Sequence, residues 1–228
     1  MTTEDDLTPP RANAGDAVYT AAKAGLAAIP LVGGTAAELV QFLVGSPLES
    51  RQTVWMDHIA DLLRRLQAER GVTVESLRDN PTFIDAVLKA SNLAVRTSSE
   101  LKRKALQAAL AHMALSPAED SIGREMFLRF IDEFTETHIR ILAALGDPGG
   151  WAREHGIRLE GMSPAQVLEQ CLPELRGKRE LYDQLWADLV GRGLVSLTNL
   201  HVMMSDVGGS KATPLGLKFL AFIRSPFD

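Results

Sequence analysis

The chain has 228 residues, of which 46% are hydrophobic and 23% charged, the balance of an ordinary globular protein with a sizeable core. Its formal net charge of -5 argues against a dedicated nucleic-acid binder, because such proteins usually carry an excess of Lys and Arg. The single cysteine, Cys171, excludes an intramolecular disulfide and a cysteine-based metal site, and it favours a reducing, cytoplasmic location.

The chain begins with an acidic, proline-containing stretch that lacks the basic and apolar regions of a secretory signal. We expect residues 1–14 to form a disordered tail. Residues 17–45 follow as the most apolar part of the chain, with two charged residues among them. They are long enough to cross a bilayer, but a proline and a glycine pair interrupt them, and they are rich in alanine. We therefore predict an apolar helical hairpin over residues 17–45.

This hairpin has two interpretations. It packs as the central hairpin of a helical bundle, which we favour, or it leaves the bundle when triggered and enters a membrane. Small residues would allow its helices to approach each other closely in lipid. The candidate contact residues for a membrane or a partner are Pro30, Gly33, Gly34 and Phe42.

Helical periodicity dominates the chain from Leu48 to Leu145. The apolar stripes of the first two helices comprise Val54, Trp55, Ile59, Leu62, Leu63 and Leu66, then Phe83, Ile84, Val87, Leu88 and Leu93. Asn80 and Pro81 begin a helix, Thr97 has the spacing of a capping box, and Ser116 precedes a proline that ends a helix. One further helix is expected from Ile122 to Leu145. Residues 15–150 are thus predicted to form a bundle of roughly six helices, followed by a linker over 151–162.

The remaining segment, residues 163–228, has the element order of a winged helix. Ser163 and Pro164 begin a helix, "KRELYDQLWADLVGRG" forms another, and "LVSLTNLHVMM", "SDVGGSKA" and "TPLGLKFLAFI" follow as strand, turn and a last strand that turns into a helix. The predicted fold class is therefore mainly α: an N-terminal helical bundle followed by a small C-terminal winged-helix-like domain with a short two-stranded wing.

The helix around Leu185 would enter the DNA groove in a winged helix that reads DNA. Its periodicity places the leucines Leu181, Leu185 and Leu189, together with Tyr182 or Trp186, inside. Carboxylates fall outside, where they would repel phosphate. Residues 163–228 contain seven basic and seven acidic residues, so the domain is neutral. We therefore expect a protein partner or self-association rather than nucleic acid. If the chain meets nucleic acid or another anionic surface, the candidate contacts are Arg96, Lys102, Arg103, Lys104, Arg176, Lys178, Arg179 and Lys211.

No catalytic motif is recognisable in the sequence. It contains no phosphate-binding loop, dinucleotide fingerprint, nucleophile elbow or kinase signature, and its five histidines do not show the spacing of metal ligands. His138 lies on an apolar helical stripe and is interpreted as a core histidine, and Cys171 as a buried, unreactive thiol. We predict no catalytic residue, no cofactor and no metal.

Four segments together resemble a known family: "AAIPLVGGTAAELVQFLVGSPLESRQTVWMDHIADLLRRL", "NPTFIDAVLKASNLAVRTSSELKRKAL", "FIDEFTETHIRIL" and "LYDQLWADLVGRGLV" with "ATPLGLKFLAFI". In their order and character they are similar to uncharacterised bacterial proteins of the abortive-infection alpha (Abi-alpha) kind. The likeness extends over residues 24–225 and rests on segment order rather than on a catalytic motif. It implies a helical body, a winged-helix-like C-terminal part and a role in phage defence.

We therefore expect a non-enzymatic, cytoplasmic helical protein that acts through protein contacts in bacterial stress or antiphage defence. The alternatives are a membrane-perturbing effector that inserts residues 17–45 and a winged-helix regulator that binds DNA.

Overall fold

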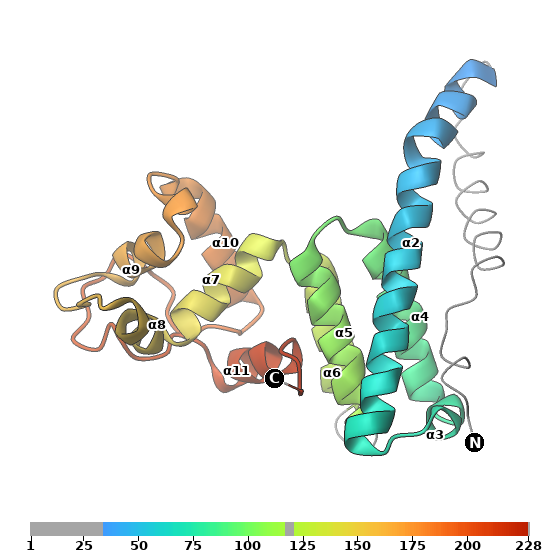
Figure 1. Cartoon of the computed structure of the whole chain (residues 1–228). Helices are drawn as coiled ribbons and strands as arrows, with labels where there is room; N and C mark the ends of the chain where they lie inside the picture. The colour runs from blue at the N-terminus through green and yellow to red at the C-terminus, as the bar shows by residue number, and fades with distance from the viewer. Residues whose placement is uncertain (1–33, 117–120, 228) are drawn as a thin grey trace. The chain divides into compact units, whose positions relative to one another are not determined.

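The computed structural model of the chain describes residues 34–116 and 121–227, which are almost entirely helical (Figure 1). The elements are α2 Gly34–Arg70, α3 Val74–Arg78, α4 Pro81–Arg96, α5 Glu100–Leu115, α6 Ser121–Glu133, α7 Glu136–Gly146, α8 Pro148–His155, α9 Pro164–Cys171, the 3-10 helix η2 Pro173–Leu175, α10 Arg179–Gly191 and α11 Pro214–Phe222. The mainly α class is confirmed. The predicted tail and most of the predicted hairpin lie outside the described residues.

The chain divides into two compact units, residues 1–121 and 122–228. The boundary falls at the start of the helix α6, whereas a linker was expected over residues 151–162. Residues 151–155 of that expected linker belong to the helix α8, which begins at Pro148 because the Asp147 side chain accepts a hydrogen bond from the Gly150 amide at 2.8 Å.

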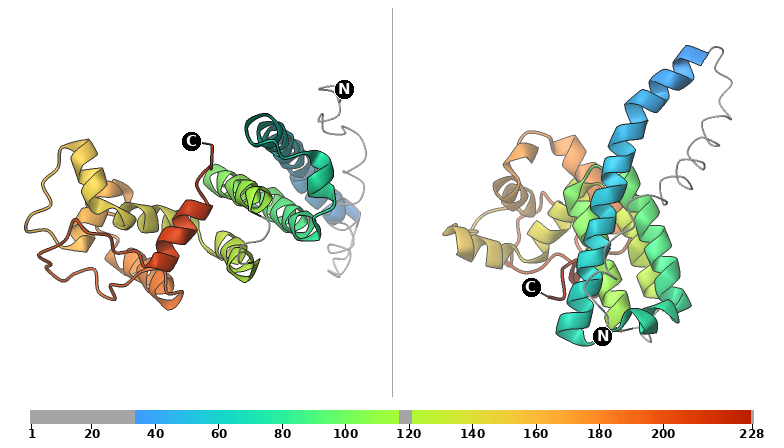
Figure 2. Two further views of the ribbon diagram at one scale, coloured as in Figure 1. Left: turned by 90° about the horizontal axis from the view of Figure 1, so that it is seen from below. Right: turned by 45° about the vertical axis from the view of Figure 1, so that its right-hand side comes forward.

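The first unit is built on α2, α4 and α5, each of which packs against the other two (Figures 1 and 2). Trp55 and Leu66 of α2 are fully buried, and α5 buries a run of alanines around Leu106 and Leu110. The helix α2 is 37 residues long and contains Pro47, so it joins the end of the segment predicted as a hairpin to the amphipathic stretch that starts at Leu48. It ends at Arg70, before Gly71, whose φ of 67° is the left-handed conformation that ends many helices.

Capping residues set the ends of α4 and α5. Asn80 accepts a hydrogen bond from the Phe83 amide at 3.1 Å with Pro81 at the first helical position, as predicted. The helix α5 is capped by Ser99 instead of Thr97, because Ser99 Oγ accepts from the Lys102 amide at 3.2 Å. Thr97 instead ends α4.

The second unit is arranged around α7, which packs against α8, α9, α10 and α11. The single helix expected from Ile122 to Leu145 is in fact two, α6 and α7. Thr135 separates them as the N-cap of α7, with its side chain accepting from the His138 amide. Phenylalanine rings join α6 to α11: Phe127 lies 5.5 Å from Phe219 and 5.4 Å from Phe222 between ring centroids.

The predicted two-stranded wing is wrong for the part of the chain that the structure describes. Residues 194–213 form a single antiparallel bridge between Val195 and Ala212. Two backbone hydrogen bonds accompany the bridge, from the Ser196 amide to the Lys211 carbonyl and from the Thr213 amide to the Leu194 carbonyl, both at 2.9 Å. Other backbone groups of this segment bond to helices. The Lys211 amide donates to the Leu145 carbonyl of α7 at 2.8 Å, and the Leu200 carbonyl accepts from the Ala165 amide of α9 at 2.9 Å. Groups that bond to neighbouring helices are not available for a strand ladder.

Candidate functional site

The basic residues predicted on the first unit lie around the turn between α4 and α5. Arg103 is largely buried and bridges that turn. Its guanidinium reaches Glu100 at 2.8 Å and donates to the carbonyl of the α4 C-cap residue at 3.1 Å. Lys102 is half-buried and has contacts of its own, whereas Arg96 and Lys104 are exposed. Arg103 therefore serves the fold, and the basic surface at this turn is smaller than the sequence predicted.

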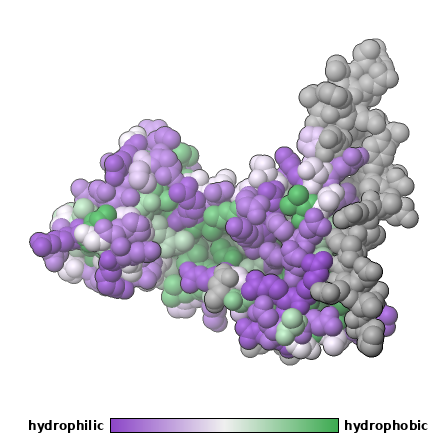
Figure 3. Space-filling model, in the orientation of Figure 1, coloured by the Kyte–Doolittle hydropathy of each residue, from purple (hydrophilic) through white to green (hydrophobic). Residues whose placement is uncertain are grey.

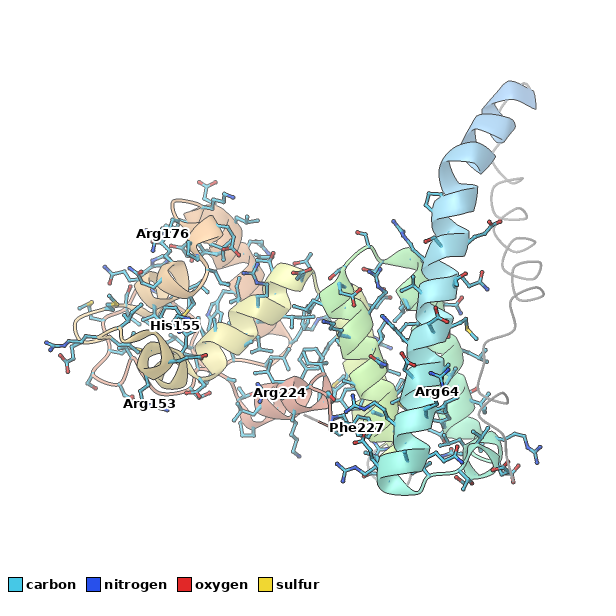
Figure 4. The ribbon with its side chains drawn as sticks, viewed as in Figure 1. Arg64, Arg153, His155, Arg176, Arg224 and Phe227 are labelled. Carbon is cyan, nitrogen blue, oxygen red and sulfur yellow. The ribbon has the colours of Figure 1, made fainter. Side chains whose placement is uncertain are left out.

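The basic residues predicted on the second unit are Arg176, Lys178 and Arg179, at the entrance to α10. Arg176 lies beside the end of α9 (Figure 4) and donates from Nε and Nη2 to its last turn, at 3.0 Å in each case. Arg179 is exposed and pairs with Asp183 at 3.3 Å, one turn along α10. Lys178 is exposed at the N-cap position. Two of these three cations are therefore already engaged within the chain.

Lys211 is placed differently from what the sequence indicated. Its residue exposure is 4%, and its ammonium donates to the Asp206 and Gly209 carbonyls at 2.7 and 2.6 Å. Burial lowers the pKa of Lys211, and the nearby Asp206 carboxylate opposes that shift. As a wing residue Lys211 was expected to reach an external phosphate, but it closes the loop over residues 206–209.

The helix α10 carries carboxylates on its outward side. Glu180 and Asp188 are exposed and Asp183 is half-exposed, in agreement with the predicted orientation. Asp183 accepts from His201 Nε2 at 2.8 Å, in addition to its pair with Arg179. Figure 3 shows hydrophilic side chains over most of the visible face of this unit.

Leu181 departs from the prediction for α10. It was expected inside the fold but is 50% exposed, whereas Tyr182, Leu185, Trp186 and Leu189 are buried. The apolar stripe is therefore rotated towards the aromatic residues, and Leu181 lies at the surface beside Glu180. In the adjoining loop, Val202 and Met203 are exposed by 38% and 68%. The sequence pattern predicts a strand at both residues and does not indicate that they are exposed.

A shallow cavity of about 440 Å³ lies between the end of α6, the start of α7 and the end of α10. It is lined by Glu133, Phe134, His138, Ala187, Asp188, Gly191 and Arg192. Two polar contacts cross it: an ion pair between Arg192 and Glu133 at 2.6 Å, and a hydrogen bond between His138 Nε2 and Asp188 Oδ2 at 3.2 Å. The charged groups of this cavity are thus paired with each other.

His138 also contacts Thr135, which completes a Thr–His–Asp series. Thr135 Oγ1 lies 2.8 Å from His138 Nδ1, a distance at which a histidine can activate a hydroxyl nucleophile. The Thr135 backbone N–H, however, donates to the same Nδ1 at 3.1 Å, and Thr135 Oγ1 accepts from the His138 amide. These reciprocal bonds form the capping box of α7, and they assign the ring proton to Nε2, which donates to Asp188. The series is therefore a helix cap, and the prediction of a satisfied core histidine is confirmed.

Other predicted features can be placed as well. Cys171 is half-buried, and burial raises the pKa of its thiol to about 11, which disfavours the reactive thiolate. No group of three or more His, Cys, Asp or Glu residues suited to a metal ion occurs in the part of the chain that the structure describes.

The candidate membrane residues fall at the edge of the described structure. Pro30 and Gly33 lie outside the described residues, and the backbone of Gly34 and Phe42 belongs to α2. Of the helices in residues 34–116 and 121–227, none combines the length and the apolar character needed to span a membrane.

No protein-family model, curated protein or solved structure matches the chain.

Proposed function

We propose that this chain is a non-enzymatic helical protein that acts through contacts with other proteins, with the outward side of α10 as its contact surface. The observation that carries the proposal is the charge distribution around α10. The carboxylates of Glu180 and Asp183 lie on the side that a nucleic-acid reader would turn towards phosphate, whereas Asp188 is held by His138. Lys211, the cation that was predicted to contact phosphate from the wing, is buried. Phosphate would be repelled from such a surface, whereas a polypeptide would not.

Apolar side chains that a protein partner could bury are exposed on and beside α10. Leu181 lies on α10, and Val202 and Met203 directly follow His201, which is bonded to α10 through Asp183. Aliphatic and methionine side chains surrounded by polar residues are typical of protein interfaces.

The experiment that tests this proposal is photocrosslinking in bacterial cells. A photoreactive amino acid at Leu181 should give a covalent adduct that protease removes and nuclease leaves intact. The matched control position is Glu154, which is exposed on α8 of the same unit. An adduct removed by nuclease would contradict the proposal, and so would equal crosslinking from Leu181 and Glu154.

The resemblance to Abi-alpha proteins supports a role in bacterial stress or phage defence. Under this proposal, expression of the chain should lower the plating efficiency of phage, and Leu181→Glu should restore it without lowering the amount of folded protein. Protection that survives Leu181→Glu would separate the defence role from the α10 surface. Absence of protection by the wild-type chain would remove the defence role.

A further inference from the structure

The helix α4 exposes two large aliphatic side chains that its sequence pattern had assigned to the core. Ile84 is 40% exposed and Leu88 is 60% exposed, and they lie one helical turn apart. On the opposite side of the helix, Phe83, Ala86 and Ala90 are buried in the unit. The helix α4 therefore has a second apolar side that α2 and α5 do not cover.

Two hydrogen bonds show where this side lies relative to α2 and α5. The Trp55 indole N–H donates to Ser91 Oγ at 2.9 Å, which fixes the line of contact between α2 and α4. The Gln107 amide of α5 donates to the His58 carbonyl at 2.9 Å, which places α5 on one flank of Trp55.

Helical spacing then shows on which side of α2 and α4 the remaining apolar residues lie. Met56 and Leu63 fall on the flank of Trp55 opposite to His58, and both are half-buried. Ile84 and Leu88 fall on the corresponding flank of α4, away from the buried alanines. These four residues, Met56, Leu63, Ile84 and Leu88, form one apolar surface across α2 and α4 on the side away from α5, which we call the outer face.

The chain itself contains an apolar segment of suitable position and length. Residues 17–33 carry a single charged residue and connect directly to Gly34, the first residue of α2. Along the helix, Met56 lies about 33 Å from Gly34, at 1.5 Å per residue. Seventeen residues span at most about 56–61 Å when extended, so the segment can turn back and reach the outer face.

We propose that residues 17–33 dock on the outer face of the same chain, as a fourth segment of the first unit in addition to α2, α4 and α5. The driving force is burial of Ile84, Leu88 and the alanine-rich segment together. The same residues would be the ones exposed if the segment were released towards a membrane. This inference is independent of the α10 surface, so either proposal can fail without the other.

Cysteine crosslinking in the full chain tests the docking. In a Cys171→Ser background, Leu88→Cys is combined in turn with Ala17→Cys, Ala21→Cys, Ala24→Cys and Ala28→Cys, and mild oxidation follows. At least one pair should form a disulfide within the monomer. The matched control is Lys89→Cys, which is exposed on another side of α4 and should give no more than background. If Leu88→Cys fails to fold, Ile84→Cys takes its place.

Three outcomes would overturn the proposal. In the first, no pair forms a disulfide within the monomer above the level of the Lys89→Cys control. In the second, disulfides form only between two chains, which would make a second copy of the chain the occupant of the outer face. The third outcome is that the cysteines placed in residues 17–33 are shielded from a water-soluble thiol reagent only when vesicles of phosphatidylglycerol and phosphatidylethanolamine are present, which would place the segment on lipid rather than on the outer face.

Discussion

His138 Nε2 lies 3.2 Å from Asp188 Oδ2 and joins α7 to α10 across 50 residues of sequence. The imidazole is buried, stacks on Phe134 with ring centroids 5.2 Å apart, and accepts the N–H of Thr135. One side chain therefore caps α7 and holds the carboxylate of α10 in place. The orientation of α10, on which the proposed function depends, is fixed partly by this contact.

His138→Ala should lower the free energy of unfolding by about 1–3 kcal/mol, because it removes the cap, the ring contact and the bond to Asp188. The coupling energy between His138→Ala and Asp188→Ala in a double-mutant cycle should be about 0.5–1.5 kcal/mol. Urea denaturation of the four proteins measures both quantities. Strictly additive effects would show that the two side chains do not stabilise each other.

Gly216→Ala should destabilise the second unit by about 3 kcal/mol or more, since overpacking of this kind cannot be relieved by a flexible neighbour. A Cβ at this position would lie 2.1 Å from the Leu194 carbonyl oxygen, a backbone atom. The control is Gly191→Ala in the last turn of α10, where a Cβ meets nothing within 4 Å. That change should be neutral or stabilise by up to about 1 kcal/mol. Thermal unfolding of both variants measures the two effects. Equal effects would mean that the backbone of α11 at Gly216 does not approach the Leu194 carbonyl closely.

Lys211→Met should destabilise the chain by about 1–3 kcal/mol, because the carbonyls of Asp206 and Gly209 lose their donor. The control is Lys104→Met at an exposed position of α5, with an expected effect within about 0.5 kcal/mol. Chemical denaturation compares the two. A stable Lys211→Met protein whose affinity for an anionic ligand has changed would instead place this ammonium at the surface.

Cys171 should make part of the stability sensitive to alkaline pH. Burial raises the pKa of its thiol from the ordinary value of 9.0 to about 11 in the folded chain. The unfolded chain therefore loses this proton first, so the contribution is complete below pH 9 and declines as the pH rises through 11. The melting temperature of Cys171→Ser should consequently fall less steeply than that of the wild type between pH 9 and 11. Parallel curves would contradict the assignment. Burial also raises the pKa of Tyr182, which acts in the same direction in both proteins and cancels from the difference.

Features set by a few neighbouring residues were predictable from the sequence. Asn80 with Pro81 and Ser163 with Pro164 begin helices as expected, and α10 ends at Gly191. Each of these signals depends on local backbone hydrogen bonds, which a short stretch of sequence specifies.

Features decided by an unusual local pattern or by contacts distant in sequence were not predictable. The break at Thr135 depends on a histidine at a position where a capping box usually has Glu or Gln, so the pattern was not recognised. Strand-like residues near Leu200 form no ladder because their backbone bonds to helices. Lys211 has the composition of a surface turn residue, but the carbonyls that surround it become visible only in three dimensions.

The measurement that tests the central claim most directly is a titration of the full chain with fluorescently labelled duplex DNA at low salt, followed by anisotropy. The outward carboxylates of α10 and the buried Lys211 predict no saturable binding, and no difference between the wild type and the variants Arg179→Ala and Lys178→Ala. A saturable complex that weakens with added salt and with Arg179→Ala would contradict the assignment of α10 as a protein-binding surface.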